Sequence, residues 1–253
     1  MAQSRGPHTP KNGWEKRWLG QALELLLRTP AILVVHAASV LFAGAAFAAI
    51  KGQGILTVLM LCALAACPIV AHGLATWFIA RADGRCDASL ETLVVRLKPM
   101  VGTAFVGVFA LAAVGIMMSG MIPNAPADPE TPPRQAANSL VAIARMGLFI
   151  HTGIYAGLSV VSLLWLPAIA SLQMTLSEAR HVQRSLFNMP MAIWLSMIMV
   201  ALYGVDMFAG VHPIAGLLAL CLRDAWFYVA AREIVGGLDD NGHPASETAL
   251  QTS

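Results

Sequence analysis

Two histidines within apolar stretches are the residues of this sequence best suited to chemistry. His36 lies six residues after Pro30, and His72 lies eight residues before Ala80. If the two stretches form an antiparallel helical hairpin, both imidazoles lie at a similar depth. A facing histidine pair can ligate haem or a transition metal, or relay a proton. The alternative is that each imidazole only forms hydrogen bonds to neighbouring backbone or hydroxyl groups. No third histidine is expected at this depth, so the sequence predicts neither a metal site nor a cofactor.

A second set of polar residues is expected toward the external ends of the later apolar stretches. The set comprises Arg145, His151, Asp206 and His212. Ionisable residues inside a membrane are costly and are often functional. Asp206 and Arg145 are therefore expected to form an ion pair that orients helices, or to line a substrate or ion site.

The adjacent residues Arg223 and Asp224 lie inside an apolar stretch. A charge at the bilayer centre costs roughly 2.5–3.5 kcal/mol on insertion scales. Neighbouring residues of a helix point about 100° apart, so the two charges do not simply neutralise each other. Two expectations follow. Arg223 binds lipid phosphate groups of the cytoplasmic leaflet, or the helix is tilted so that both charges lie near its cytoplasmic end.

The sequence lacks the common catalytic motifs. It has no HExxH, Walker loop or GxSxG pattern. The four cysteines show no CxxC or Cys/His ligand spacing, and an apolar setting favours their role as small hydrophobic residues. We therefore expect a protein that is not an enzyme.

Six apolar stretches are long enough to position these residues across a bilayer. Only 12% of the 253 residues are charged and 57% are hydrophobic, whereas soluble domains average about 25% charged residues. A membrane-spanning helix needs roughly 20 apolar residues. The stretches cover residues of about 31–50, 55–80, 100–121, 146–172, 190–209 and 212–234. The sequence predicts an all-α, polytopic membrane bundle.

Lysine and arginine indicate the orientation of this bundle. Twelve of them lie in the lead to Pro30, in the 81–99 and 173–189 loops and at the end of the sixth stretch. The opposite side has only Lys51 and Arg134. Because cytoplasmic loops carry an excess of Lys and Arg, both termini are expected in the cytoplasm.

A threefold pattern groups the six stretches into three hairpins. Each odd-numbered stretch begins at a proline, Pro30, Pro99 or Pro190, that ends a short amphipathic segment. Proline cannot continue the preceding helix without losing a hydrogen bond, so each marks a bend. Basic amphipathic helices of this kind lie in the membrane interface. We therefore expect an interfacial helix before each hairpin.

Three segments lie outside the hairpins. Residues 1–13 are expected to form a flexible N-terminus, and 236–253 a disordered cytoplasmic tail. Residues 122–139 are rich in proline and polar groups and are expected to form a long external loop. Residues 14–235 then form one transmembrane domain.

Three segments also carry a resemblance to a known family. They are GWEKRWLGQALELLLRTP, GLATWFIARADGRCDASLETL and AWFYVAAREIVGG. The chain resembles uncharacterised proteobacterial inner-membrane proteins, similar in layout to YciC-like proteins and to the membrane domain of some glycerophosphodiester phosphodiesterases. The resemblance implies a multi-hairpin, multi-pass bundle in the bacterial inner membrane. It implies no activity and supplies no catalytic residues.

Three functions fit these observations. The first is a non-enzymatic scaffold, accessory subunit or lipid-interacting module, whose partners are membrane lipids and other membrane subunits rather than nucleic acid. The second is a transporter of small solutes or lipids with a polar path near Arg223 and Asp224. The third is a haem or metal protein that uses His36 and His72.

Overall fold

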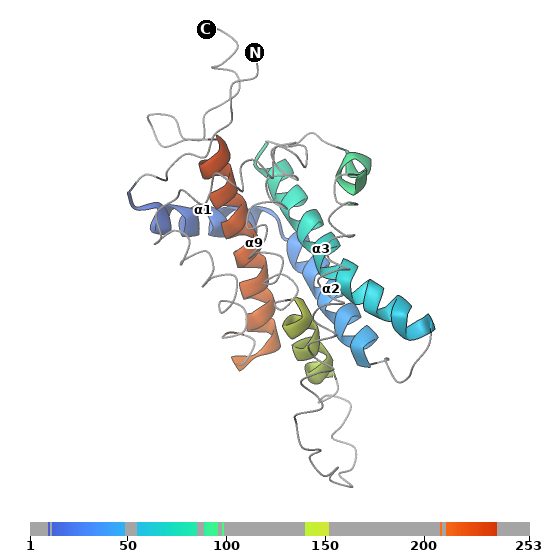
Figure 1. The fold of residues 1–253 in the computed structure, drawn as a ribbon. Coiled ribbons are helices and arrows are strands. Elements are labelled where there is room, and N and C mark those ends of the chain that lie inside the picture. Colours follow the sequence, from blue (N-terminus) through green and yellow to red (C-terminus); the bar gives the residue numbers. More distant parts are fainter. Residues whose placement is uncertain are drawn as a thin grey trace.

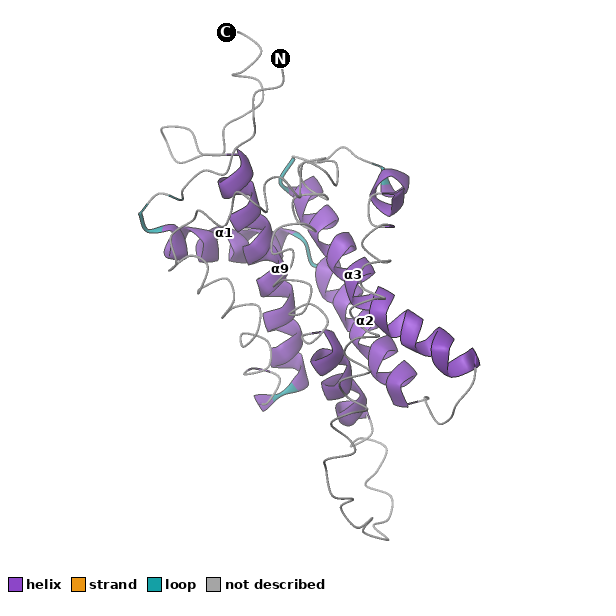
Figure 2. Ribbon diagram, in the orientation of Figure 1, coloured by secondary structure: helices purple, strands orange, loops and turns teal. Residues whose placement is uncertain are grey.

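Helices make up all the regular structure in the part of the chain that the computed structural model describes (Figures 1 and 2). This part comprises residues 10, 12–48, 55–84, 89–95, 98, 140–151, 208 and 211–236. The prediction of an all-α fold is confirmed for these residues. The predicted stretches at 100–121 and 190–209 fall outside them except for residue 208. Also outside the described residues are 152–172, the predicted loop at 122–139, the third amphipathic segment and the predicted tail beyond 236.

The first amphipathic segment and the first hairpin are present. Helix α1 (Trp14–Arg28) is followed after two residues by α2 (Ala31–Ala48), and α3 (Ile55–Ala82) runs back along α2. The axes of α1 and α2 differ by 87° across the Thr29–Pro30 junction. The bend at the first proline, predicted from the missing proline N–H, is confirmed. Residues 90–95 of the second amphipathic segment are also helical.

Two glycines set how closely the segment Leu140–His151 approaches α2. A Cβ atom added to Gly44 would lie 2.0 Å from the carbonyl oxygen of Ile143. One added to Gly147 would lie 1.9 Å from the carbonyl oxygen of Val40. No side chain fits at either position, so the two backbones are in direct contact. Small residues serve the same purpose at many membrane helix interfaces.

Helix α9 (Pro213–Gly236) is the most enclosed described element. Nearly all of its side chains from Leu220 to Ile234 are buried, and it contacts α1, α2 and α3. The absence of a preferred apolar face in its sequence fits this enclosure. The span Pro213–Ile234 is long and apolar enough to cross a membrane, and the bent α1–α2 pair passes the same test if it is counted as one span.

Candidate metal centre

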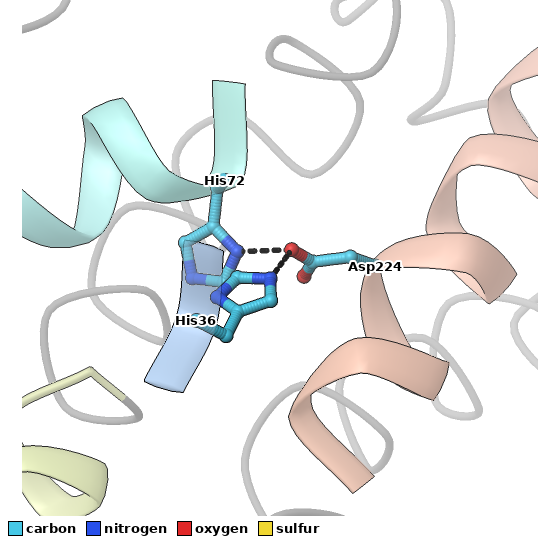
Figure 3. A group of neighbouring side chains, drawn as sticks. All are labelled: His36, His72 and Asp224. Atoms are coloured by element: carbon cyan, nitrogen blue, oxygen red, sulfur yellow. Dashed lines mark hydrogen bonds and ion pairs between the residues drawn. The ribbon is translucent and has the colours of Figure 1, made fainter. Parts of the chain in front are cut away.

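Three helices place polar side chains at one point inside the bundle (Figure 3). His36 comes from α2, His72 from α3 and Asp224 from α9, and all three are fully or almost fully buried. The Oδ2 atom of Asp224 lies 2.8 Å from His36 Nε2 and 2.6 Å from His72 Nδ1. The expected proximity of His36 and His72 is confirmed, because their ring centroids are 5.2 Å apart. We call His36, His72, Arg223 and Asp224 the central cluster.

His151 is a third histidine at this level, so the expectation that none exists is wrong. Its ring centroid lies 6.2 Å from that of His36 and 5.8 Å from that of His72. The expectation placed His151 near the start of a span beginning at 146. The chain is already helical at Leu140, so at about 1.5 Å per residue His151 lies roughly 16 Å further along the helix.

Ser39 connects His151 to the first hairpin. Its Oγ atom lies 2.8 Å from His151 Nε2 and 2.9 Å from Cys67 Sγ. The buried His151 is therefore bonded to α2 through Ser39, which in turn contacts Cys67 on α3.

Arg223 turns toward the interior of the bundle, so the expectation that it binds lipid phosphate groups is wrong. It is 2% exposed, and its Nη2 atom lies 2.9 Å from His72 Nε2. Its Nε atom also lies 3.6 Å from Asp224 Oδ1. Both side chains are thus enclosed by the bundle. The expected tilt, which would place them near the cytoplasmic end of the span, stays a prediction. Arg223 and Asp224 point in different directions from the helix, yet both contact His72. Arg223 contacts its Nε2 atom and Asp224 its Nδ1 atom.

The hydrogen bonds define which ring nitrogen of His72 carries hydrogen. A guanidinium can only donate, so His72 Nε2 accepts from Arg223. His72 must then carry its hydrogen on Nδ1 and donate it to the Asp224 carboxylate, which also accepts from His36 Nε2. In this arrangement the negative charge of Asp224 lies beside the positive charge of Arg223. The two charges offset each other within the bundle.

The other predicted site residues lie apart from this cluster. Arg145 is exposed on the segment Leu140–His151. His212 is also exposed, and its Nδ1 accepts a hydrogen bond from the backbone N–H of Ile214. Asp206 lies outside the described residues, and with it the predicted pair with Arg145.

A second polar network, not predicted from the sequence, joins α1 and α3 to the end of α9. Glu233 accepts hydrogen bonds from Arg17 (2.5 Å) and from the Trp18 indole (2.5 Å). Arg232 donates to Asp83 (2.7 Å) and to Gln21 (2.6 Å). Tyr228 donates to the same Asp83 oxygen at 2.7 Å. The only sequence feature that pointed to this network is the adjacent pair Arg232 and Glu233 near the end of the sixth apolar stretch. We call these seven residues the terminal network.

The sequence matches no protein family and no curated protein, and no solved structure matches the fold. The resemblance to proteobacterial inner-membrane proteins therefore stays a prediction. The geometry of the described residues is what bears on function.

Proposed function

We propose that this chain is a non-enzymatic, membrane-embedded helix bundle that binds a divalent transition-metal ion through His36, His72 and Asp224. One observation carries the proposal. Each residue offers a ligand atom, these atoms lie within 4.8 Å of one another, and all three residues are buried. They come from three different helices, so only the folded bundle brings them together.

The donor set selects the class of ion. Imidazole nitrogens favour Zn²⁺, Fe²⁺, Co²⁺ or Ni²⁺, whereas Ca²⁺ and Mg²⁺ favour oxygen ligands. Metal–nitrogen and metal–oxygen bonds of about 2.0–2.2 Å require ligand atoms a little over 3 Å apart. The nitrogen–oxygen distances of 2.8 and 2.6 Å need only a small expansion. Haem fits poorly, because one carboxylate oxygen contacts both imidazoles where a porphyrin would have to lie.

Incomplete hydrogen bonding supports the same reading. Among the described residues, no hydrogen-bond partner is present for His36 Nδ1, His151 Nδ1 or Asp224 Oδ1. A buried polar atom without a partner costs about 1–3 kcal/mol. His36 and Asp224 therefore have bonding capacity beyond the hydrogen bonds that they form within the cluster.

Arg223 opposes metal binding in this arrangement. An ion on His72 Nδ1 displaces the hydrogen there, and a neutral imidazole must then carry it on Nε2. That nitrogen can no longer accept from Arg223, and the guanidinium also repels the ion. Arg223 must therefore move away when the ion binds, so Arg223 and the ion compete for His72.

We propose further that the bundle has six spans arranged as three hairpins, in a bacterial inner membrane and with both termini in the cytoplasm. Large apolar side chains on α2 support a lipid-facing surface, since Val34 is 69% exposed and Phe42 is 51% exposed. Soluble proteins rarely expose large contiguous apolar surfaces. The uneven distribution of Lys and Arg supports the orientation.

The test is metal binding by the full-length protein, purified in detergent and freed of metal. Titration with Zn²⁺, and with Co²⁺ followed by visible absorption, should give one ion per chain. His36→Ala and His72→Ala should each weaken binding at least about 100-fold, given that even outer-shell changes cost 10–100-fold. His212→Ala is the matched control, because this histidine is exposed and outside the cluster. Equal affinity in all four proteins would refute the site.

A proton relay is the second candidate, favoured by the continuous hydrogen-bonded chain from Arg223 through His72 and Asp224 to His36. Histidine is well suited to accept and pass on protons near neutral pH. In proteoliposomes, a relay would dissipate an imposed pH gradient, and His72→Ala would abolish this. If vesicles that contain the wild-type protein maintain the pH gradient, the relay is excluded, and the metal proposal is unaffected.

A further inference from the structure

Helix α1 has three distinct faces. Trp18, Ala22 and Leu25 are buried and form its protein face. Leu19, Leu23 and Leu27 follow one another at every fourth position, so they form a single row. They are 45%, 44% and 84% exposed, and we call them the leucine face.

Charged residues occupy the third face. Glu24 and Arg28 are both exposed and form an ion pair along the helix. At 100° per residue, they lie about a third of a turn from the leucine face and from the protein face. Two exposed charged residues precede the leucine row on the first turn, Glu15 four residues and Lys16 three residues before Leu19, where long side chains can carry their charges toward the surface. The three faces thus require three different surroundings: protein, an apolar phase and water.

The terminal network prevents α1 from turning its leucines inward. Arg17 and Trp18 both bond to Glu233 on α9, and the rings of Trp18 and Trp226 are 5.3 Å apart. A rotation that buried Leu23 would break these contacts and expose the Trp18 indole. The exposure of the leucine face is therefore a fixed feature of the fold.

The right-angle bend defines where this face lies. The axis of α1 is at 87° to that of α2. If α2 crosses the bilayer, as in the proposed architecture, α1 runs along the membrane surface. On the first turn of α2, Val34 is exposed as well.

We propose that Leu19, Leu23 and Leu27 insert into the cytoplasmic lipid leaflet, at the boundary between headgroups and acyl chains. This inference rests on the proposed membrane location but not on metal binding. A lipid leaflet is the occupant that fits all three faces at once, because it offers an apolar layer directly beneath water. Helices that lie in this boundary carry apolar residues on one face and charges on the other.

The test places a nitrobenzoxadiazole label on single cysteines, introduced by Leu23→Cys or Leu27→Cys into a background whose native cysteines are replaced by alanine. Glu24→Cys, on the charged face of the same helix, is the matched control. The full chain is reconstituted into phosphatidylcholine–phosphatidylglycerol vesicles. Labels at 23 and 27 should be quenched several-fold more than the label at 24 by lipids spin-labelled near the headgroup. Aqueous iodide should give the reverse order.

Equal quenching at all three positions, or stronger iodide quenching at 23 and 27, would overturn the inference. Benzoylphenylalanine at Leu23 in the chain with native cysteines provides a second measurement that needs no cysteine-free background. Crosslinking to lipid supports the inference, whereas crosslinking to a second copy or to another protein refutes it. Metal titration of the same proteins separates the two proposals: intact metal binding without lipid contact contradicts this inference alone.

Discussion

The central cluster and the terminal network are two polar groups on the same buried helix. Each contains a buried atom without a hydrogen-bond partner among the described residues, Arg232 Nε in the terminal network, but they differ in how their carboxylate oxygens are bonded. In the terminal network, both oxygens of Glu233 and one oxygen of Asp83 accept from charged or indole donors. In the central cluster, two histidines share a single oxygen of Asp224, and polar atoms of His36 and Asp224 have no hydrogen-bond partner among the described residues.

This difference separates a network that holds helices from one that has capacity for a ligand. Strong donors on strong acceptors stabilise one arrangement of the helices. Imidazole nitrogens around a carboxylate are suitable ligands for a transition-metal ion. We therefore expect changes in the terminal network to affect stability alone, and changes in the central cluster to affect binding as well.

Asp224→Ala should have the largest effect. It removes the carboxylate that joins α2, α3 and α9, and breaking a buried ion pair on one side costs about 3–5 kcal/mol. We expect this loss in the free energy of unfolding, measured by denaturation in detergent, together with loss of Zn²⁺ binding by calorimetry. Asp224→Asn keeps the shape of the side chain and should lose binding with a smaller loss of stability. Full Zn²⁺ affinity in the asparagine variant would mean that the carboxylate is not a ligand.

Glu233→Gln should lower stability without affecting binding. It removes the charge from hydrogen bonds to Arg17 and Trp18, and such charged bonds contribute about 1.5–3 kcal/mol. Glu24→Gln is the control, since the exposed Glu24–Arg28 pair should contribute under about 0.5 kcal/mol. Unfolding curves and Zn²⁺ titrations of both variants make the measurement. A substantial loss of Zn²⁺ affinity in folded Glu233→Gln protein would show that the terminal network, like the central cluster, affects metal binding.

Arg223→Gln should tighten metal binding, which is unusual for a change inside a binding cluster. The variant removes a positive charge, and the amide oxygen of glutamine can accept the hydrogen that His72 carries on Nε2 when an ion occupies Nδ1. We expect about a tenfold gain in Zn²⁺ affinity, equivalent to about 1.4 kcal/mol. Arg28→Gln, at an exposed position of α1, should leave the Zn²⁺ affinity unchanged. Weaker binding in Arg223→Gln would show that Arg223 supports the site rather than opposing it.

Ser39→Ala should have the smallest effect and tests whether His151 belongs to the metal site. The lost hydrogen bond to His151 should cost about 0.5–1.5 kcal/mol of stability. If His151 only lines the site, the Zn²⁺ affinity should stay within about threefold of the wild type. A tenfold change would instead indicate that Ser39 positions His151 as a fourth ligand, and His151→Ala should then weaken binding further.

Much of the helical layout could be predicted because it depends on local sequence. The apolar runs at 31–50 and 55–80 correspond to Ala31–Ala48 and Ile55–Ala82, and Pro30 marks the bend. The depth of His36 and His72 followed from the hairpin. The inward direction of Asp224 did not, because a helix that is apolar all round has no periodicity to define its inner side. The contact between Glu233 and Trp18 joins residues far apart in the chain, and no local pattern encodes it.

The enclosed position of α9 has a consequence for how this protein is made. Synthesis runs from the N-terminus, so α1, α2 and α3 leave the ribosome before the helix that they surround. Until α9 arrives, His36 and His72 lack their carboxylate, and Trp18 and Arg17 lack Glu233. The contacts between α2 and α3 do not involve α9 and can form before it arrives, whereas both polar groups are complete only once α9 is in place. Helix α9, the most enclosed of the described helices, is thus the last of them to be synthesised.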